Sequence, residues 1–195
     1  MEKKLIQEPN NIVKIVLFGP ESTGKTTLSR DLARHYNTVW VPEYARTYLQ
    51  EKWDNERKIC EKEDIIPIAI GQMNLENKLA KKANTVLICD TDLLETKVYS
   101  QEFYDGFVDK RLDEVARKNK YDLYFLTYID TPWIADDLRD RPQQRLEMFT
   151  AFEKALKEHD RPYIVLKGTK TQRLQKAVKA IDRLLSGFNF ANPLT

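Results

Sequence analysis

The chain has 195 residues, with 32 Lys and Arg against 30 Asp and Glu, so its formal net charge at pH 7 is only +2. A chain of this length can bury roughly 70% of the surface that its unfolded form exposes, so it needs no disulfide or metal staple. With 42% apolar and 32% charged residues, the composition excludes a disordered tail and a basic domain that coats a polyanion. We therefore predict one globular domain over residues 1–195, with a polar leader at 1–11.

The cysteines and the apolar runs exclude two further classes of protein. Cys60 and Cys89 stand far apart, with no second thiol or histidine at ligand spacing, which argues against a zinc site and against a secreted disulfide scaffold. The longest apolar-like run, residues 65–70, is far too short to span a bilayer. We expect a cytoplasmic protein with reduced cysteines and no membrane partner.

Short apolar strands alternate with amphipathic helices along the chain. Strands are predicted at residues 12–18, 38–41, 85–89, 122–129 and 163–166. Helices are predicted from Thr26 to about 36, over about 63–83, over 93–118 with a break near Gly106, after 145, and near the C-terminus through Leu185. This alternation predicts an α/β fold, a three-layer αβα sandwich around a five-stranded parallel sheet, with ligands at the carboxyl ends of the strands.

Residues 19–26 read Gly-Pro-Glu-Ser-Thr-Gly-Lys-Thr and match the phosphate-loop pattern G-x-x-x-x-G-K-[ST] between a predicted strand and a predicted helix. Backbone N–H groups of such a loop point at phosphate oxygens, and its glycines let the backbone approach the anion. We predict that Lys25 holds the β- and γ-phosphates of ATP and that Thr26 ligates Mg²⁺. The predicted nucleotide contacts are Gly19, Glu21, Ser22, Thr23, Gly24, Lys25, Thr26 and Thr27. The alternative is a Gly-rich turn that only opens a helix.

Two carboxylates follow the third predicted strand. Asp90 lies at its carboxyl end, where an acidic group can reach Mg²⁺ directly or through water. Asp92 would then lie at the mouth of the cleft, free to accept a hydrogen bond from a substrate hydroxyl. The alternative for Asp92 is an N-cap on the helix that begins there, a role that Asp fills well.

The sequence resembles the nicotinamide-riboside kinase domain of the bacterial NAD-biosynthesis regulator and its stand-alone relatives among the P-loop kinases. The resemblance is carried by residues 19–28, by Pro-Glu-Tyr-Ala-Arg at 42–46, by Asp-Thr-Asp at 90–92, by Asp-Thr-Pro-Trp at 130–133 and by Asp-Leu-Arg at 137–139. It covers about residues 14–185 and implies a P-loop kinase that uses ATP and Mg²⁺ to phosphorylate nicotinamide riboside in NAD salvage. The regulator carries further modules before its kinase, whereas about 18 residues precede the phosphate loop here, so the resemblance implies that this chain phosphorylates the riboside and leaves adenylation to another enzyme. The regulator also has an aromatic residue where this chain has Pro42. Which ring stacks on the nicotinamide therefore stays open.

The second predicted strand ends beside the phosphate loop, and Glu43 follows it. Its carboxylate could orient or deprotonate the ribose 5′-hydroxyl, a role that the resemblance supports, whereas the alternative is a surface or helix-capping Glu. Tyr44 and Arg46 are expected beside the acceptor, and Arg46 pairs either with Glu43 or with the ligand.

A lid is predicted at about residues 131–145, where arginines and acids alternate after the fourth strand. Lid closure would exclude water and bring an arginine to the transferring phosphate. Arg139 is the first candidate, followed by Arg145 and Arg141, and the alternative is a solvated helix face laced by salt bridges. Trp133 could stack on a cationic pyridinium ring or simply pack.

The loop after the fifth strand is expected to wrap the adenine, with Gly168 and Thr169 against the base. The basic excess between 154 and 183 lacks an aromatic platform, so we expect no nucleic-acid partner. Two other functions stay open: a P-loop kinase of another small nucleoside or nucleotide, and a regulatory switch that hydrolyses ATP or GTP slowly. The sequence does not indicate an oligomeric state.

Overall fold

The structure, a computed structural model, describes residues 5–138 and 142–187. Its centre is a five-stranded sheet in the order β2-β3-β1-β4-β5, in which every neighbouring pair is parallel. The strands are β1 (Val13–Phe18), β2 (Trp40–Val41), β3 (Val86–Asp90), β4 (Leu123–Thr127) and β5 (Tyr163–Leu166). The predicted α/β fold with a five-stranded parallel sheet is confirmed.

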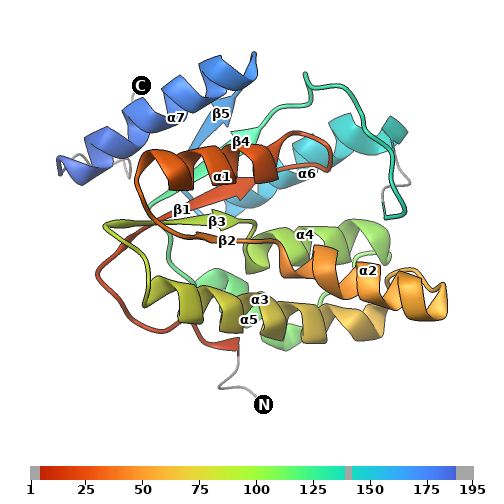
Figure 1. Ribbon diagram of the computed structural model, residues 1–195. Coiled ribbons are helices and arrows are strands. Elements are labelled where there is room, and N and C mark those ends of the chain that lie inside the picture. The colour runs from red at the N-terminus through yellow and green to blue at the C-terminus, as the bar shows by residue number, and fades with distance from the viewer. Residues whose placement is uncertain (1–4, 139–141, 188–195) are drawn as a thin grey trace.

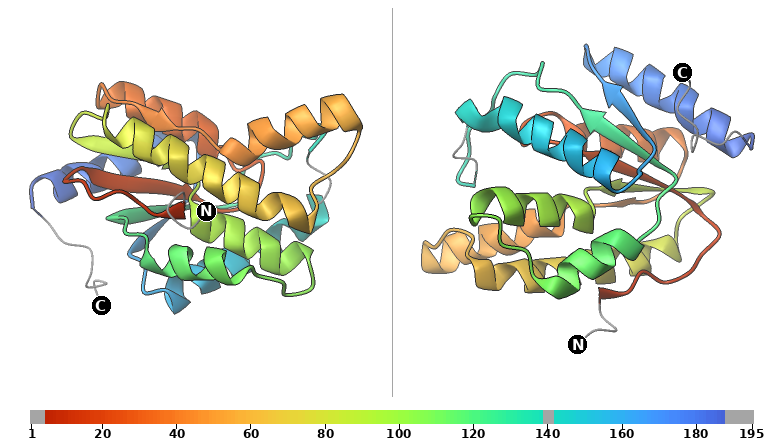
Figure 2. Two further views of the ribbon diagram at one scale, coloured as in Figure 1. Left: turned by 90° about the horizontal axis from the view of Figure 1, so that it is seen from below. Right: turned by 180° about the vertical axis from the view of Figure 1, so that it is seen from behind.

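Helices cover both faces of the sheet and complete the three predicted layers. They are α1 (Lys25–His35), α2 (Tyr44–Glu56), α3 (Ile65–Ala80), α4 (Leu93–Phe103), α5 (Lys110–Lys118), α6 (Arg145–Glu158) and α7 (Lys170–Leu185), with short 3₁₀ turns η2 (Lys62–Asp64) and η3 (Pro142–Gln144). Figures 1 and 2 show α1 and α7 on one side of the sheet and α3, α4 and α5 on the other.

The central strand β1 explains why its sequence reads as an almost unbroken apolar run. Ile15 and Leu17 pack with α1 and α7 in one core cluster, whereas Val16 and Phe18 pack with residues of α3, α4, α5 and α6 in the other. A strand buried on both faces has no solvated side on which polar residues could alternate.

The helix α2 is absent from the sequence prediction. Its exposed and half-buried positions follow each other without a buried stripe, and none of its residues is fully buried. The predicted helix at 63–83 is shorter in the structure, since η2 precedes α3 and α3 ends at Ala80. The predicted break near Gly106 is confirmed, because Gly106 adopts φ +80° between α4 and α5.

No helix in the described parts of the chain combines the length and the apolar character that crossing a bilayer demands.

Candidate active site

The phosphate loop turns from β1 into α1 and needs a glycine at its first position. Gly19 adopts φ +131°, and a Cβ there would lie 2.9 Å from Thr127 Oγ1 and 3.0 Å from the Thr127 carbonyl oxygen. Gly24, at φ +84°, is the N-cap of α1 and makes no side-chain capping bond. The first N–H groups of α1 are therefore left for an anion, as the loop pattern predicts.

Lys25 is buried at the start of α1. Its Nζ donates to the Gly19 carbonyl at 2.6 Å and to the Pro20 carbonyl at 3.1 Å, and lies 3.2 Å from Glu95 Oε1. Burial alone would lower the pKa of Lys25, but the carboxylates of Glu95, Glu43 and Asp90 outweigh it and raise that pKa. Lys25 is thus held as an ammonium ion at the centre of the loop.

Glu95 is a site residue that the sequence reasoning missed. It lies in the first turn of α4, is only 1% exposed, and accepts a hydrogen bond from the Gly19 N–H through Oε2 at 3.2 Å. Burial raises its pKa to about 8, although the Lys25 ammonium opposes that shift. Its position one helical turn after Asp92, at a sheet edge rich in ligand groups, is the signal that could have found it.

The two predicted metal ligands lie together. Thr26 Oγ1 donates to Asp90 Oδ2 at 2.6 Å, while the other Asp90 oxygen, Oδ1, is buried and has no hydrogen-bond partner among the described residues. Burial raises the pKa of Asp90 to about 6, so it is largely ionised at pH 7. A hydroxyl beside a carboxylate with an unused oxygen is a donor set that fits Mg²⁺, which prefers hard oxygen ligands.

The predicted position of Asp92 at the mouth of the cleft is wrong. Asp92 is 1% exposed, and it accepts from the Glu95 N–H at 3.0 Å and from the Tyr124 hydroxyl at 2.7 Å. It is the N-cap of α4, which is the alternative that the sequence left open. The strong N-capping preference of Asp, together with a buried tyrosine donor, turns the carboxylate inward.

Other loop residues brace the turn. Ser22 adopts φ +56°, its Oγ accepts from the Ile134 N–H at 2.8 Å, and its carbonyl accepts from Thr131 Oγ1 at 2.7 Å. Thr23 is buried, and its Oγ1 donates to the Pro20 carbonyl at 2.7 Å. Thr23 therefore supports the loop from inside, and Ser22 ties it to the segment that follows β4.

A cleft in front of the loop has two lobes that share wall residues. The phosphate lobe, of about 370 Å³, is lined by Gly24, Lys25, Thr26, Thr27, Arg46 and Thr131, among others. The acceptor lobe, of about 550 Å³, is lined largely by apolar and aromatic side chains, including Trp53, Ile65, Ile68, Tyr99, Phe103 and Tyr104. Both lobes are lined by Glu21, Glu43, Leu49, Tyr99 and Leu138.

The structure brings Glu43 and Arg46 to this cleft but turns Tyr44 away. Glu43 lies where the two lobes meet. Arg46 lines the phosphate lobe and forms an ion pair with Asp136 at 2.5 Å. The ring of Tyr44 packs against Gly71 of α3, since a Cβ on Gly71 would collide with it. Tyr44 is thus a packing residue between two helices.

Two of the predicted substrate residues lie beside the loop and outside the described lining of the acceptor lobe. Arg145 donates to the Thr131 carbonyl at 2.9 Å and to the Ser22 carbonyl at 3.2 Å. Its guanidinium carbon lies 5.8 Å from the centre of the Trp133 ring. Trp133 therefore packs on an arginine of this chain. Arg139 and Arg141, the other lid candidates, lie outside the described residues.

The loop that was predicted to wrap the adenine is anchored to the phosphate loop. Gly168, at φ +96°, donates its N–H to Asp130 Oδ2 at 2.6 Å, and Thr169 caps α7. Arg173, which is 4% exposed, donates to the Thr23 carbonyl at 2.6 Å and to the Gly168 carbonyl at 3.0 Å, and it forms an ion pair with Asp130. The sequence reasoning missed Arg173, which looks like one more charge in a basic helix.

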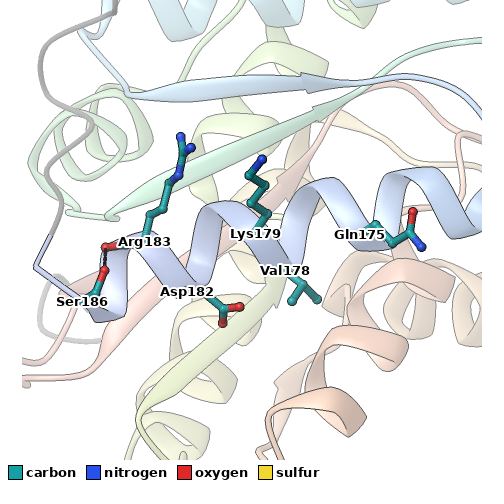
Figure 3. Close-up of a pocket in the computed structure, with 6 residues that line it drawn as sticks. All are labelled: Gln175, Val178, Lys179, Asp182, Arg183 and Ser186. Carbon is teal, nitrogen blue, oxygen red and sulfur yellow. Dashed lines mark hydrogen bonds between the residues drawn. The ribbon is translucent and has the colours of Figure 1, made fainter.

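A separate hollow of about 440 Å³ lies along α7 (Figure 3). All of its described lining residues come from that helix and its end: Gln175, Val178, Lys179, Asp182, Arg183 and Ser186. A hollow with one wall does not enclose a nucleoside, in contrast to the two-lobed cleft.

Comparisons with known proteins agree with this geometry. A family profile described as AAA domain (AAA_28) matches residues 14–173. The Trifunctional NAD biosynthesis/regulator proteins NadR of Salmonella typhimurium and Escherichia coli are each 32% identical to the chain over 136 residues. The match covers 68% of this chain but 32% of NadR, so the chain spans about a third of these relatives. The predicted resemblance to the NAD-biosynthesis regulator is confirmed.

Solved structures share the fold. NadR in complex with NR superposes with a TM-score of 0.74 and 23% identity, covering 94% of this chain and 54% of that one. NadR in complex with NAD and AMP-PNP superposes with a TM-score of 0.71 and 22% identity, covering 94% of this chain and 52% of that one. Thymidylate kinase from Ehrlichia chaffeensis superposes with a TM-score of 0.62 and 17% identity, covering 89% of this chain and 100% of that one. The chain thus has the fold of the P-loop kinases.

Proposed function

The chain belongs to the AAA domain family AAA_28, and we propose that it is an ATP- and Mg²⁺-dependent kinase that phosphorylates the 5′-hydroxyl of nicotinamide riboside. The observation that carries this proposal is the two-lobed cleft, in which Glu43 stands between a phosphate lobe and an aromatic acceptor lobe. The reaction would yield nicotinamide mononucleotide and ADP in cytoplasmic NAD salvage.

The phosphate lobe supports ATP as the donor. Backbone N–H groups of the phosphate loop and the Lys25 ammonium would bind the β- and γ-phosphates, where positive charge counters the charge that spreads over the transferring group. Thr26 and Asp90 are the residues that would hold Mg²⁺. When bound, the ion neutralises phosphate charge and orients the γ-phosphate.

The acceptor lobe supports a small cationic nucleoside. Its aromatic walls, including Trp53, Tyr99 and Phe103, suit a flat ring, and its carboxylates include those of Glu21 and Asp137. Among the described residues that line it there is no Lys, Arg or His. Electron-rich ring faces and carboxylates both attract a cation, so the lobe favours a pyridinium ring over an anionic acceptor.

The chemical step is a direct displacement. The 5′-oxygen would attack the γ-phosphorus, the bond from that phosphorus to the β–γ bridging oxygen would break, and ADP would leave with the electron pair. Glu43 would orient the hydroxyl and accept its proton, which places a general base at the junction of donor and acceptor. Positioning and electrostatic stabilisation supply most of the rate in such a transfer.

A nucleoside panel tests this proposal. The purified chain would be incubated with ATP, Mg²⁺ and nicotinamide riboside, nicotinate riboside, deoxyadenosine, thymidine or no acceptor, and products would be measured by mass spectrometry and ADP release. We expect nicotinamide mononucleotide together with an equal amount of ADP. Robust use of a deoxynucleoside without use of nicotinamide riboside would assign the chain to a deoxynucleoside kinase, a candidate suggested by its structural similarity to deoxyadenosine kinase, with a TM-score of 0.55. ADP release that no acceptor stimulates would indicate a nucleotide-hydrolysing switch.

A further inference from the structure

Glu43 occupies an unusual place for a residue assigned to substrate. It is the N-cap of α2, yet its side chain makes no capping hydrogen bond. The side chain of a short N-cap residue such as Asp accepts from the second or third N–H of its helix, and the N–H groups of the first turn have no partner within the helix. The N–H of Tyr44, the first residue of α2, therefore needs an acceptor from elsewhere in the fold.

Gln72 of α3 supplies this acceptor. Its Oε1 accepts from the Tyr44 N–H, the first of α2, at 2.7 Å. Its Nε2 donates to the Pro42 carbonyl at 3.4 Å, on the other side of Glu43. One amide side chain therefore holds the backbone both before and after Glu43, using its donor and its acceptor at once.

The packing of α2 against α3 holds the Gln72 side chain in this position. Gln72 is only 2% exposed and lies on the acceptor lobe. The residue before it is Gly71, which has no Cβ to collide with the ring of Tyr44, so α2 can lie close along α3 (Figure 1). Gly71 and Gln72 thus support the turn from Pro42 to Tyr44 on the side that faces α3.

We propose that Gln72 is a positioning residue for Glu43: its amide bonds the backbone on both sides of Glu43 and so holds that carboxylate at the junction of the two lobes. This inference rests on the proposed function, because Glu43 acts there on the acceptor hydroxyl. Both polar atoms of the Gln72 side chain are engaged with the backbone of this turn. Its effect passes through Glu43, which distinguishes it from the nucleotide residues Lys25, Thr26 and Asp90.

The test replaces Gln72 by Met, which keeps a long side chain but makes neither hydrogen bond. Since a misplacement of about 1 Å can cost a factor of about 100 in rate, we expect kcat to fall about 10- to 100-fold. The KM for ATP should stay within about twofold, because the phosphate lobe is untouched. Gln72→Glu keeps an acceptor for the Tyr44 N–H, so its kcat should fall less than that of Gln72→Met. Asn74→Met, at an exposed position of the same helix, is the control and should behave as the natural chain.

A double-mutant cycle separates positioning from a general structural role. If Gln72 acts through Glu43, then adding Gln72→Met to a Glu43→Gln chain should lower kcat no further. If the two losses of kcat multiply in the double variant, or if Gln72→Met leaves kcat unchanged, the inference is overturned. Thermal unfolding of every variant shows whether it is folded, and if Gln72→Met is not, Gln72→Asn, whose side chain is one methylene shorter, makes the same comparison.

The natural chain distinguishes the two proposals. Absence of phosphorylation of every nucleoside by the natural chain would overturn the proposed function. A natural chain that is active but insensitive to Glu43→Gln would leave the kinase assignment standing and overturn the roles of Glu43 and Gln72 together.

Discussion

Glu95 should dominate the pH dependence of stability above neutrality, and Glu95→Gln is the change that exposes this. Burial raises the pKa of Glu95 from its ordinary value of 4.5 to about 8. Between these two pH values the folded chain keeps a proton that the unfolded chain has released. The free energy of unfolding therefore falls as the pH rises through this range: the contribution is complete below about pH 4.5 and lost by about pH 8.

The size of the effect follows from the width of that window. One extra bound proton changes the free energy of unfolding by up to about 1.4 kcal/mol per pH unit. Between pH 6.5 and pH 8 the natural chain should lose about 1 to 2 kcal/mol to Glu95 alone. In the Glu95→Gln chain the substituted amide does not titrate, so this part of the slope should disappear. Burial raises the pKa values of Asp90 and Asp92 to about 6. At the lower end of this pH range they should therefore add the same slope of stability against pH in both chains.

Urea denaturation at pH 6.5, 7, 7.5 and 8 measures the effect, with the slope of stability against pH compared between chains. Glu102→Gln, at an exposed position of the same helix α4, is the matched control and should leave the slope unchanged. Equal slopes for the natural chain and Glu95→Gln would show that Glu95 titrates outside this window, and would refute the reasoning from burial.

Three further changes probe the cleft. Lys25→Ala should abolish phosphoryl transfer while the circular dichroism spectrum stays unchanged, because the remaining Glu95 can be protonated near neutral pH; retained turnover would contradict the assigned site. Thr26→Val removes the hydroxyl that donates to Asp90 and should raise the Mg²⁺ concentration for half-maximal activity about tenfold; a magnesium titration measures this, and an unchanged midpoint counts against the metal site. Arg173→Met leaves Asp130 without its ion pair and should cost about 2 to 4 kcal/mol of unfolding free energy and raise the KM for ATP. Lys179→Met, at an exposed position on α7, should change neither, and equal behaviour of the two α7 variants would refute the anchoring role of Arg173.

The sequence by itself determined the layers of the fold and the phosphate end of the site. The signals there are local. A strand buried on both faces must be apolar throughout, as at β1, and a loop that approaches phosphate needs glycines and a lysine at fixed spacing. Thr26 and Asp90 could be paired in advance because the carboxyl ends of neighbouring parallel strands meet at one edge.

The sequence predicted Glu43 and Arg46 at the acceptor end, and tertiary structure decided the rest of it. The helix α2 shows no buried stripe in its sequence because it lies over a cleft and has no residue fully buried. Gln72, Glu95 and Arg173 are polar residues inside helices, where spacing does not say whether a side chain is solvated or buried against a distant backbone group. Each is defined by partners 28 to 150 residues away. Asp92 was predicted at the mouth of the cleft for the same reason: the Tyr124 hydroxyl that helps to turn its carboxylate inward comes from another strand, which the local sequence does not reveal.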